Sequence, residues 1–174
     1  MTRGGRLLIA LAAAAVPLAA VHAAALVVTK SSVVVADAVS SVFPKALPGA
    51  SVDYAILVNN PNGLLSGESI GAVQISDTIP ANMIFSTANY GTGSGPIEFA
   101  DGSLLGLGLL GSGLTYTYRG LADATDSVEF FNGTTWSYRP TAGLDPNVRA
   151  IRVTLSGTQA PTTTFRLRFR VRVK

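Results

Sequence analysis

Apolar and polar residues alternate most regularly near the end of the chain. Every second residue is apolar from Phe165 to Val173. The positions between them are arginines: Arg166, Arg168, Arg170 and Arg172. Residues 51–59 alternate in the same way, with Val52, Tyr54, Ile56 and Val58 on one side. A period of two residues is typical of a β-strand that buries one face, so both segments are predicted to be strands.

Other segments have a similar pattern or a strong strand composition. They cover residues 26–39, 71–76, 83–85, 97–99, 114–119, 128–131, 134–138 and 148–155. Asn132-Gly133 predicts a tight hairpin between two of them, and the Leu/Gly-rich residues 104–114 predict a loop or a twisted edge. No helix is predicted after residue 23. The pattern favours an all-β fold, an antiparallel β-sandwich of two packed sheets.

The first 23 residues read as a secretory signal peptide. Two arginines precede a short apolar stretch, residues 7–20, and small residues surround His22. This order of charge, apolar core and small residues is typical of a cleaved leader. The apolar stretch is shorter than the roughly 20 residues that a membrane-spanning helix needs. The expected mature protein is a single domain, residues 24–174, with no membrane span, located outside the cell, on its surface or in the periplasm.

Composition narrows the chemistry that this domain could perform. Charged residues make up only 13% of the chain, against about a quarter in average soluble domains. The chain has no cysteine, and its single histidine, His22, lies in the predicted leader. The mature domain would therefore have no thiol or histidine for catalysis or metal binding. No pair of carboxylates stands out as a glycosidase site, so we expect no catalytic residues and no enzyme.

The net charge of +3 is unevenly distributed along the chain. Arg3 and Arg6 belong to the predicted leader, and five basic residues lie among the last nine. The alternating arginines could bind an anionic polymer such as a polysaccharide. The favoured interpretation is a solvated face whose like charges prevent edge-to-edge aggregation. Nucleic acid is not expected as a partner.

Two further groups of residues could form ligand sites. Asp123 and Asp126 could offer oxygen ligands to calcium, although the spacing of an EF-hand is absent and exposed turn carboxylates are the alternative. No other cofactor is expected. Trp136 and Tyr138 could stack against a sugar, although aromatic residues on strands more often form core or cross-strand pairs.

Residues 29–85 contain an ordered set of motifs. They are Lys30, then Leu47-Pro48-Gly49 before a tyrosine-bearing strand that ends in Asn59-Asn60, and then Asp77-Thr78-Ile79-Pro80-Ala81. This order resembles the conserved repeat domain of bacterial cell-surface proteins, domain of unknown function eleven, and the arginine-rich last strand is similar to its closing strand. The resemblance implies an immunoglobulin-like or prealbumin-like sandwich. It transfers no catalytic residues, and a single copy favours a free or envelope-associated subunit.

These observations predict a secreted, non-enzymatic structural or cell-surface protein that acts through contacts with itself or with other envelope proteins. Residues 24–39 form an apolar, strand-prone segment ahead of the first turn. This segment could complete its own sheet or add as a strand to a neighbouring subunit, which would give self-assembly or filaments. The alternative function is a module that binds carbohydrate or another envelope polymer through the arginines and aromatic residues, in adhesion for example.

Overall fold

The structure is a computed structural model, and it describes residues 25–64, 67–102 and 110–174. These residues form β-strands without an α-helix, which confirms the all-β prediction. The strands are β1 (Val27–Ala36), β2 (Ser51–Asn59), β3 (Ile70–Gly71), β4 (Gln74–Thr78), β5 (Met83–Ser86), β6 (Ile97–Asp101), β7 (Leu114–Thr115), β8 (Val128–Phe131), β9 (Leu144–Asp145), β10 (Ala150–Thr154), β11 (Ser156–Gln159) and β12 (Thr164–Val173). The predicted signal peptide lies outside the described residues.

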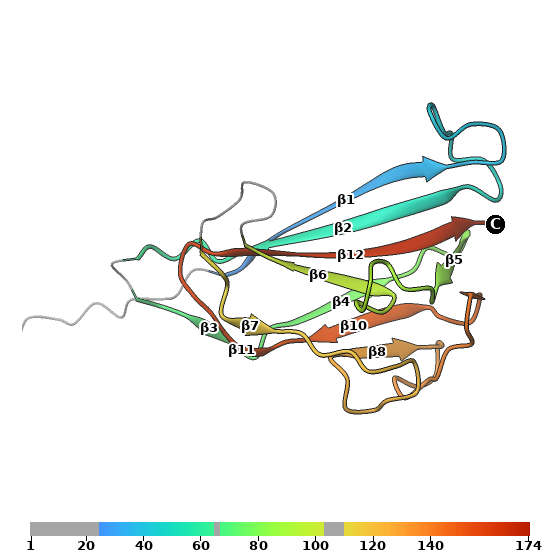
Figure 1. The fold of residues 1–174 in the computed structure, drawn as a ribbon. Helices are drawn as coiled ribbons and strands as arrows, with labels where there is room; N and C mark the ends of the chain where they lie inside the picture. Colours follow the sequence, from blue (N-terminus) through green and yellow to red (C-terminus); the bar gives the residue numbers. More distant parts are fainter. Residues whose placement is uncertain (1–24, 65–66, 103–109) are drawn as a thin grey trace, which may run out of the picture.

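The largest sheet has six strands in the order β1-β2-β12-β5-β9, with β6 also paired to β12 (Figure 1). We call it the large sheet. Its pairs are antiparallel, and β12 lies in the middle. The strand β2 covers one side of β12, while β6 and β5 share the other side, beside residues 165–169 and 171–173. The strand β1 pairs with β2 of its own chain, so this segment completes its own sheet.

Two three-stranded sheets form the second layer. Their orders are β4-β10-β8 and β3-β11-β7. They follow one another because β10 and β11 are separated only by Leu155, and they lie end to end below the large sheet in Figure 1. These pairs are also antiparallel.

The core lies between the two layers. Phe85 in the large sheet is fully buried, and its ring lies 5.8 Å from that of Phe130 in β8 and 5.9 Å from that of Phe169 in β12. Alternation along the strands directs one face of each layer inward. The buried set from the best-patterned strands is Val52, Ile56, Val58, Val128, Ile151, Val153, Phe165, Leu167 and Val171. Burying such side chains contributes about 1.5–3 kcal/mol each.

A charged contact joins the layers beside their edge strands. Lys30 of β1 points toward the second layer, where its Nζ lies 2.7 Å from a carboxylate oxygen of Asp77 in β4. The same nitrogen lies 4.5 Å above the ring of Tyr54. The two charges are therefore paired with each other within the chain. As a result Lys30, the only charged residue of β1, does not point along the free edge of the strand.

Three predicted strands differ from the structure. The segment 71–76 is divided between β3 and β4, which belong to different sheets, and the chain bends between them at Ala72, whose φ is 52°. The segment 134–138 forms a single bridge from Tyr138 to Phe130 in place of a strand. The side chain of Asn132 accepts hydrogen bonds from the amides of Thr134 and Thr135, and this local turn replaces the expected two-residue hairpin. In the segment 114–119 only Leu114–Thr115 is a strand. Most of the segment 104–114 lies outside the described residues.

Candidate functional site

The arginines of β12 lie on the outer face of the large sheet, opposite the core. Strand register places Arg168 beside Ala55 of β2 and Glu98 of β6. It places Arg170 beside Asp53 of β2. The register therefore builds rows of side chains across the sheet, in which carboxylates from β2 and β6 reach arginines that are distant in sequence.

Two of these arginines form paired ionic contacts. Arg168 donates from Nε and from a terminal nitrogen to the two oxygens of Glu98, at 2.5 and 2.7 Å. Arg170 donates in the same way to the two oxygens of Asp53, at 2.6 and 2.9 Å. Two-point contacts of this kind fix the orientation of the guanidinium as well as adding electrostatic energy. These arginines are held as part of the sheet surface.

Tyr90 covers this pair of contacts. Its hydroxyl donates to Asp53 at 2.7 Å, and its ring lies 4.8 Å from the guanidinium carbon of Arg168 and 5.5 Å from that of Arg170. Burial by itself would raise the pKa of Asp53, but the hydrogen bonds from Arg170 and Tyr90 hold it below its usual value. Asp53 therefore stays ionised and organises the centre of the outer face.

Arg166 differs from its neighbours. Only 17% of its side chain is exposed, and its acidic contact is a terminal nitrogen 3.6 Å from Glu98. Within the described residues its buried Nε has no hydrogen-bond partner. Burial and the nearby charge of Arg168 lower the pKa of Arg166. A guanidinium has five N–H donors, and the described residues leave the one at Nε buried without a partner.

A groove of about 330 Å³ runs over this face between β1 and β12. Ala55 lies between Ser31 and Arg168 in one cross-strand row, and its small side chain leaves the space. The residues around the groove are Ser31, Ser32, Val33, Val35, Asp53, Tyr54, Ala55, Tyr90, Arg166 and Arg168. The groove thus combines hydroxyl groups, aromatic rings, a carboxylate and the incompletely paired Arg166. The other two β12 arginines, Arg170 and Arg172, do not line it, and Arg172 donates to the carbonyl of Gly49.

The outer edge of β1 borders this groove. The strand β1 pairs with β2 on one side and with no other described strand. The first seven of its ten residues are exposed, and Val33 is 59% exposed. The edge contains no proline, and one bulge interrupts its register between Val34 and Ala36. Alternate residues of such an edge direct their N–H and C=O groups away from the sheet, where another strand can pair with them.

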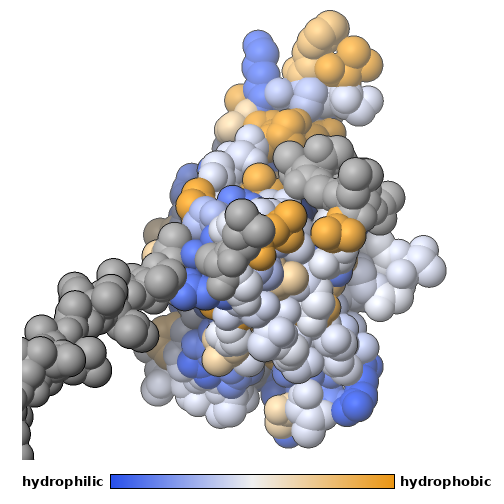
Figure 2. Space-filling model, turned by 90° about the vertical axis from the view of Figure 1, so that its left-hand side faces the viewer, coloured by the Kyte–Doolittle hydropathy of each residue, from blue (hydrophilic) through white to orange (hydrophobic). Residues whose placement is uncertain are grey.

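An apolar loop continues from the end of β1. Val39, Val42 and Phe43 are highly exposed, Phe43 to 82%. The loop is nevertheless ordered, because the carboxylate of Asp37 accepts the amides of residues 39, 40 and 45. Figure 2 shows apolar surface gathered at the top of the molecule, where Figure 1 places this loop. The loop and the β1 edge together form the most exposed apolar region among the described residues.

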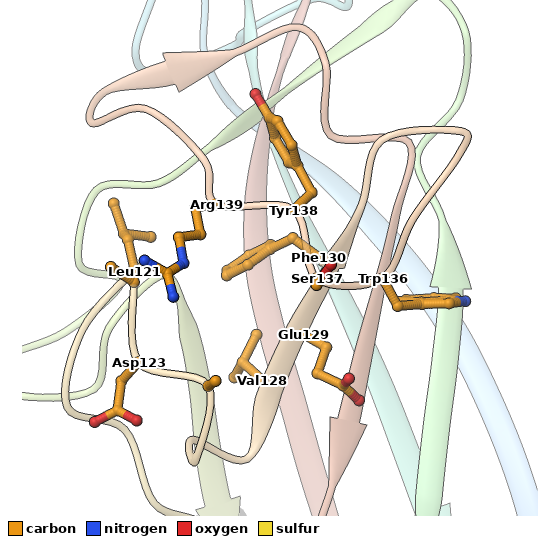
Figure 3. Close-up of a pocket in the computed structure, with 11 residues that line it drawn as sticks. Leu121, Asp123, Val128, Glu129, Phe130, Trp136, Ser137, Tyr138 and Arg139 are labelled. Atoms are coloured by element: carbon orange, nitrogen blue, oxygen red, sulfur yellow. The ribbon is translucent and has the colours of Figure 1, made fainter.

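The predicted aromatic residues lie on the second layer. Trp136 stacks on Phe131 at 5.1 Å, and the guanidinium of Arg152 lies 4.2 Å above its ring. The hydroxyl of Tyr138 donates to Asp145 at 2.9 Å. Both residues border a hollow of about 120 Å³, but Figure 3 shows their rings pointing in different directions. The structure therefore does not bring them together with the β12 arginines or into one flat surface.

The predicted calcium ligands form turns. Asp123 accepts the amide and the hydroxyl of Thr125, and Asp126 accepts the amides of Arg119 and Gly120. In the part of the chain that the structure describes, no three acidic or histidine side chains come together as a metal-binding group. The carboxylates thus have a structural role in this loop, and calcium stays a prediction that no contact here supports.

Comparison with protein-family models, with curated proteins and with solved structures found no match to this chain. The resemblance to the surface repeat domain therefore stays a prediction. Within the described ranges, no helix is long and apolar enough to cross a membrane.

Proposed function

We propose that this chain is a secreted, non-enzymatic structural or cell-surface protein that self-assembles by β-strand addition along the free edge of β1. The partner strand is β1 of a second copy. The observation that carries the proposal is the edge itself, ten residues long, with a single charge that is already paired to Asp77 on the second layer. Long edges without outward charges or proline are those to which another strand adds most readily.

Secretion and the finer fold belong to the same proposal. The leader-like residues 1–23 and the low charge content support export. Two layers of antiparallel strands around one core support an immunoglobulin-like or prealbumin-like sandwich. Domains of this kind present their edges and loops to partners, which is the use that we assign to β1.

The sequence of β1 suits pairing with itself. A two-fold axis perpendicular to the sheet at Ser31 makes the two strands antiparallel and keeps the outer faces on the same side. Lys30 then faces Ser32 of the second copy, Thr29 faces Val33, and Val28 faces Val34. No like charges face each other, and exposed valines gain cross-strand contacts. The bulge after Val34 limits this pairing to about seven residues. A contact of this symmetry is closed and favours a dimer over a filament.

Cysteine cross-linking tests this arrangement directly, because the natural chain has no cysteine. Ser31→Cys is expected to form a disulfide-linked dimer, since residues that face each other across antiparallel strands have Cβ atoms about 4.5–5.5 Å apart. The measurement is non-reducing electrophoresis after mild oxidation, together with light scattering of the unmodified protein over a concentration series.

A serine on the other layer gives the matched control. Ser76→Cys changes an exposed serine in the middle of β4, which is also an edge strand. It should cross-link far more slowly than Ser31→Cys. Ser31→Lys would place like charges opposite each other and should weaken dimerisation by at least about tenfold. Equal cross-linking of the two cysteine variants, with a monomer at every concentration, would contradict the proposal.

A further inference from the structure

The charged side chains around the groove over Ala55 leave one positive charge in excess. This excess suits a ligand unit that carries a single negative charge. Three arginines of β12 (Arg166, Arg168 and Arg170) face two carboxylates, Asp53 and Glu98, on this part of the outer face. The two carboxylates are occupied by Arg168 and Arg170 through two-point contacts. The remaining positive charge belongs to Arg166, which borders the groove.

Arg166 is costly for the fold. A partly buried cation without full hydrogen bonding loses hydration that its neighbours do not replace. Its Nε is buried and has no partner within the described residues, and the nearest acidic oxygen already accepts a shorter bond from Arg168. A buried donor that its own chain leaves unpaired is typical of a residue that serves a ligand at some cost in stability.

The surroundings of Arg166 select the kind of ligand. A densely charged polyanion such as nucleic acid would place further negative charges close to Asp53 and Glu98, which would repel them. A neutral chain would leave the donors of Arg166 unused. The hydroxyl of Ser31 and the ring of Tyr90, which both border the groove, can contact the hydroxyl groups and the faces of a sugar. The best match is a chain of sugars in which acid groups are spaced by neutral hydroxyl groups.

We propose that this groove binds an acidic polysaccharide, with the carboxylate of one sugar unit held by Arg166 and the sugar lying over Ala55 toward Ser31. This inference does not depend on dimerisation, since the residues that it uses belong to one chain. If the β1 edges do pair around a two-fold axis, the grooves of both copies open on the same side of the joined sheet.

Calorimetry with oligogalacturonate as the probe tests the proposal. The full chain without residues 1–23 should bind oligogalacturonate and should not bind its methyl ester, which has the same sugars without the charge. Arg166→Gln should weaken binding by about tenfold or more, since it removes a charge-assisted hydrogen bond to the ligand carboxylate. The same variant should be at least as thermally stable as the parent, a result that a purely structural arginine would not give.

Arg172→Gln is the matched control. It removes an arginine from the same strand that lies outside the groove and should leave binding within about twofold, which is about 0.4 kcal/mol. Should Arg166→Gln fail to fold, Ala55→Leu fills the floor of the groove without changing charge and should abolish binding. Cross-linking of the Ser31→Cys variant is measured in parallel and tests dimerisation alone. A failure of sugar binding can therefore be told apart from a failure of the dimer proposal.

Several results would overturn the inference. One is equal affinity of the Arg166→Gln and Arg172→Gln variants. Another is equal binding of oligogalacturonate and its methyl ester. Preferential binding of nucleic acid, or full competition by inorganic phosphate at the same concentration, would show that the groove recognises charge alone and not an acidic sugar.

Discussion

Replacing Phe85 with alanine should lower the free energy of unfolding by about 3–5 kcal/mol, the usual loss for a fully buried phenylalanine. The Phe85 ring is fully buried and contacts Phe130 in the second layer and Phe169 in the large sheet. The substitution would therefore leave a cavity where the two layers meet. Urea unfolding followed by circular dichroism and by the fluorescence of the only tryptophan, Trp136, measures the loss.

Phe43 provides the matched control, because it is the same residue type at 82% exposure. Phe43→Ala should change the free energy of unfolding of the monomer by no more than about 0.5 kcal/mol. A Phe85→Ala protein that loses less than about 1 kcal/mol would mean that the layers do not pack through this ring.

Asp145→Asn should lower the free energy of unfolding at pH 7 by about 2–3 kcal/mol, because it turns an amide donor toward groups that are themselves donors. Asp145 is fully buried and accepts hydrogen bonds from the amides of Thr141 and Asn147 and from the hydroxyl of Tyr138. Burial by itself would raise the pKa of Asp145, but these hydrogen bonds lower it below its usual value. The measurement is urea unfolding at pH 7.

The lowered pKa of Asp145 also fixes the sign of a pH effect. Its stabilisation is complete above the pKa of the unfolded chain, near the ordinary value of 3.8. It is lost as the pH falls through the lower pKa of the folded state. The difference between the natural chain and Asp145→Asn should therefore be largest near neutral pH and shrink below about pH 4. A difference that grows on acidification would contradict this assignment.

Asp123→Asn is the comparison variant for this experiment. Asp123 also accepts hydrogen bonds, from Thr125, but it lies in a surface turn and holds no strand in place. We expect its effect on the free energy of unfolding to be clearly smaller than that of Asp145→Asn. Equal effects would mean that burial of the carboxylate at position 145 is not what makes it important.

Alternation alone was enough to predict the strands that build the core. The segment 51–59 is β2 with the same bounds, and the segment 165–173 differs from β12 only by Thr164. One face of each strand points into the core and the other points away from it, and a period of two is the direct result of that arrangement. The prediction of a strand at 134–138 was wrong because the side chain of Asn132 forms a local turn. This contact outweighs the strand propensity of the aromatic residues.

The candidate site was predictable only in part. The β12 arginines stood out because they recur at every second position. Asp53 and Tyr90 carry no such signal, and they become partners only through the register that sets Asp53 beside Arg170, 117 residues away. The sequence favoured a solvated arginine face, whereas two of the arginines are paired to carboxylates. Arg166 differs from the other arginines because its side chain is more buried. The alternation of apolar and polar residues does not reveal how deeply each arginine is buried.

The central place of β12 has a consequence for how the chain is made. The strand β2 needs β12 as its second neighbour, and β5 and β6 need β12 as well. During synthesis, none of these pairs can form until residues 164–173 have left the ribosome. Contacts between such distant residues form late and slowly. The large sheet therefore cannot close before residues 164–173 are available, and until then the part of the chain that precedes them can still be threaded through a narrow pore.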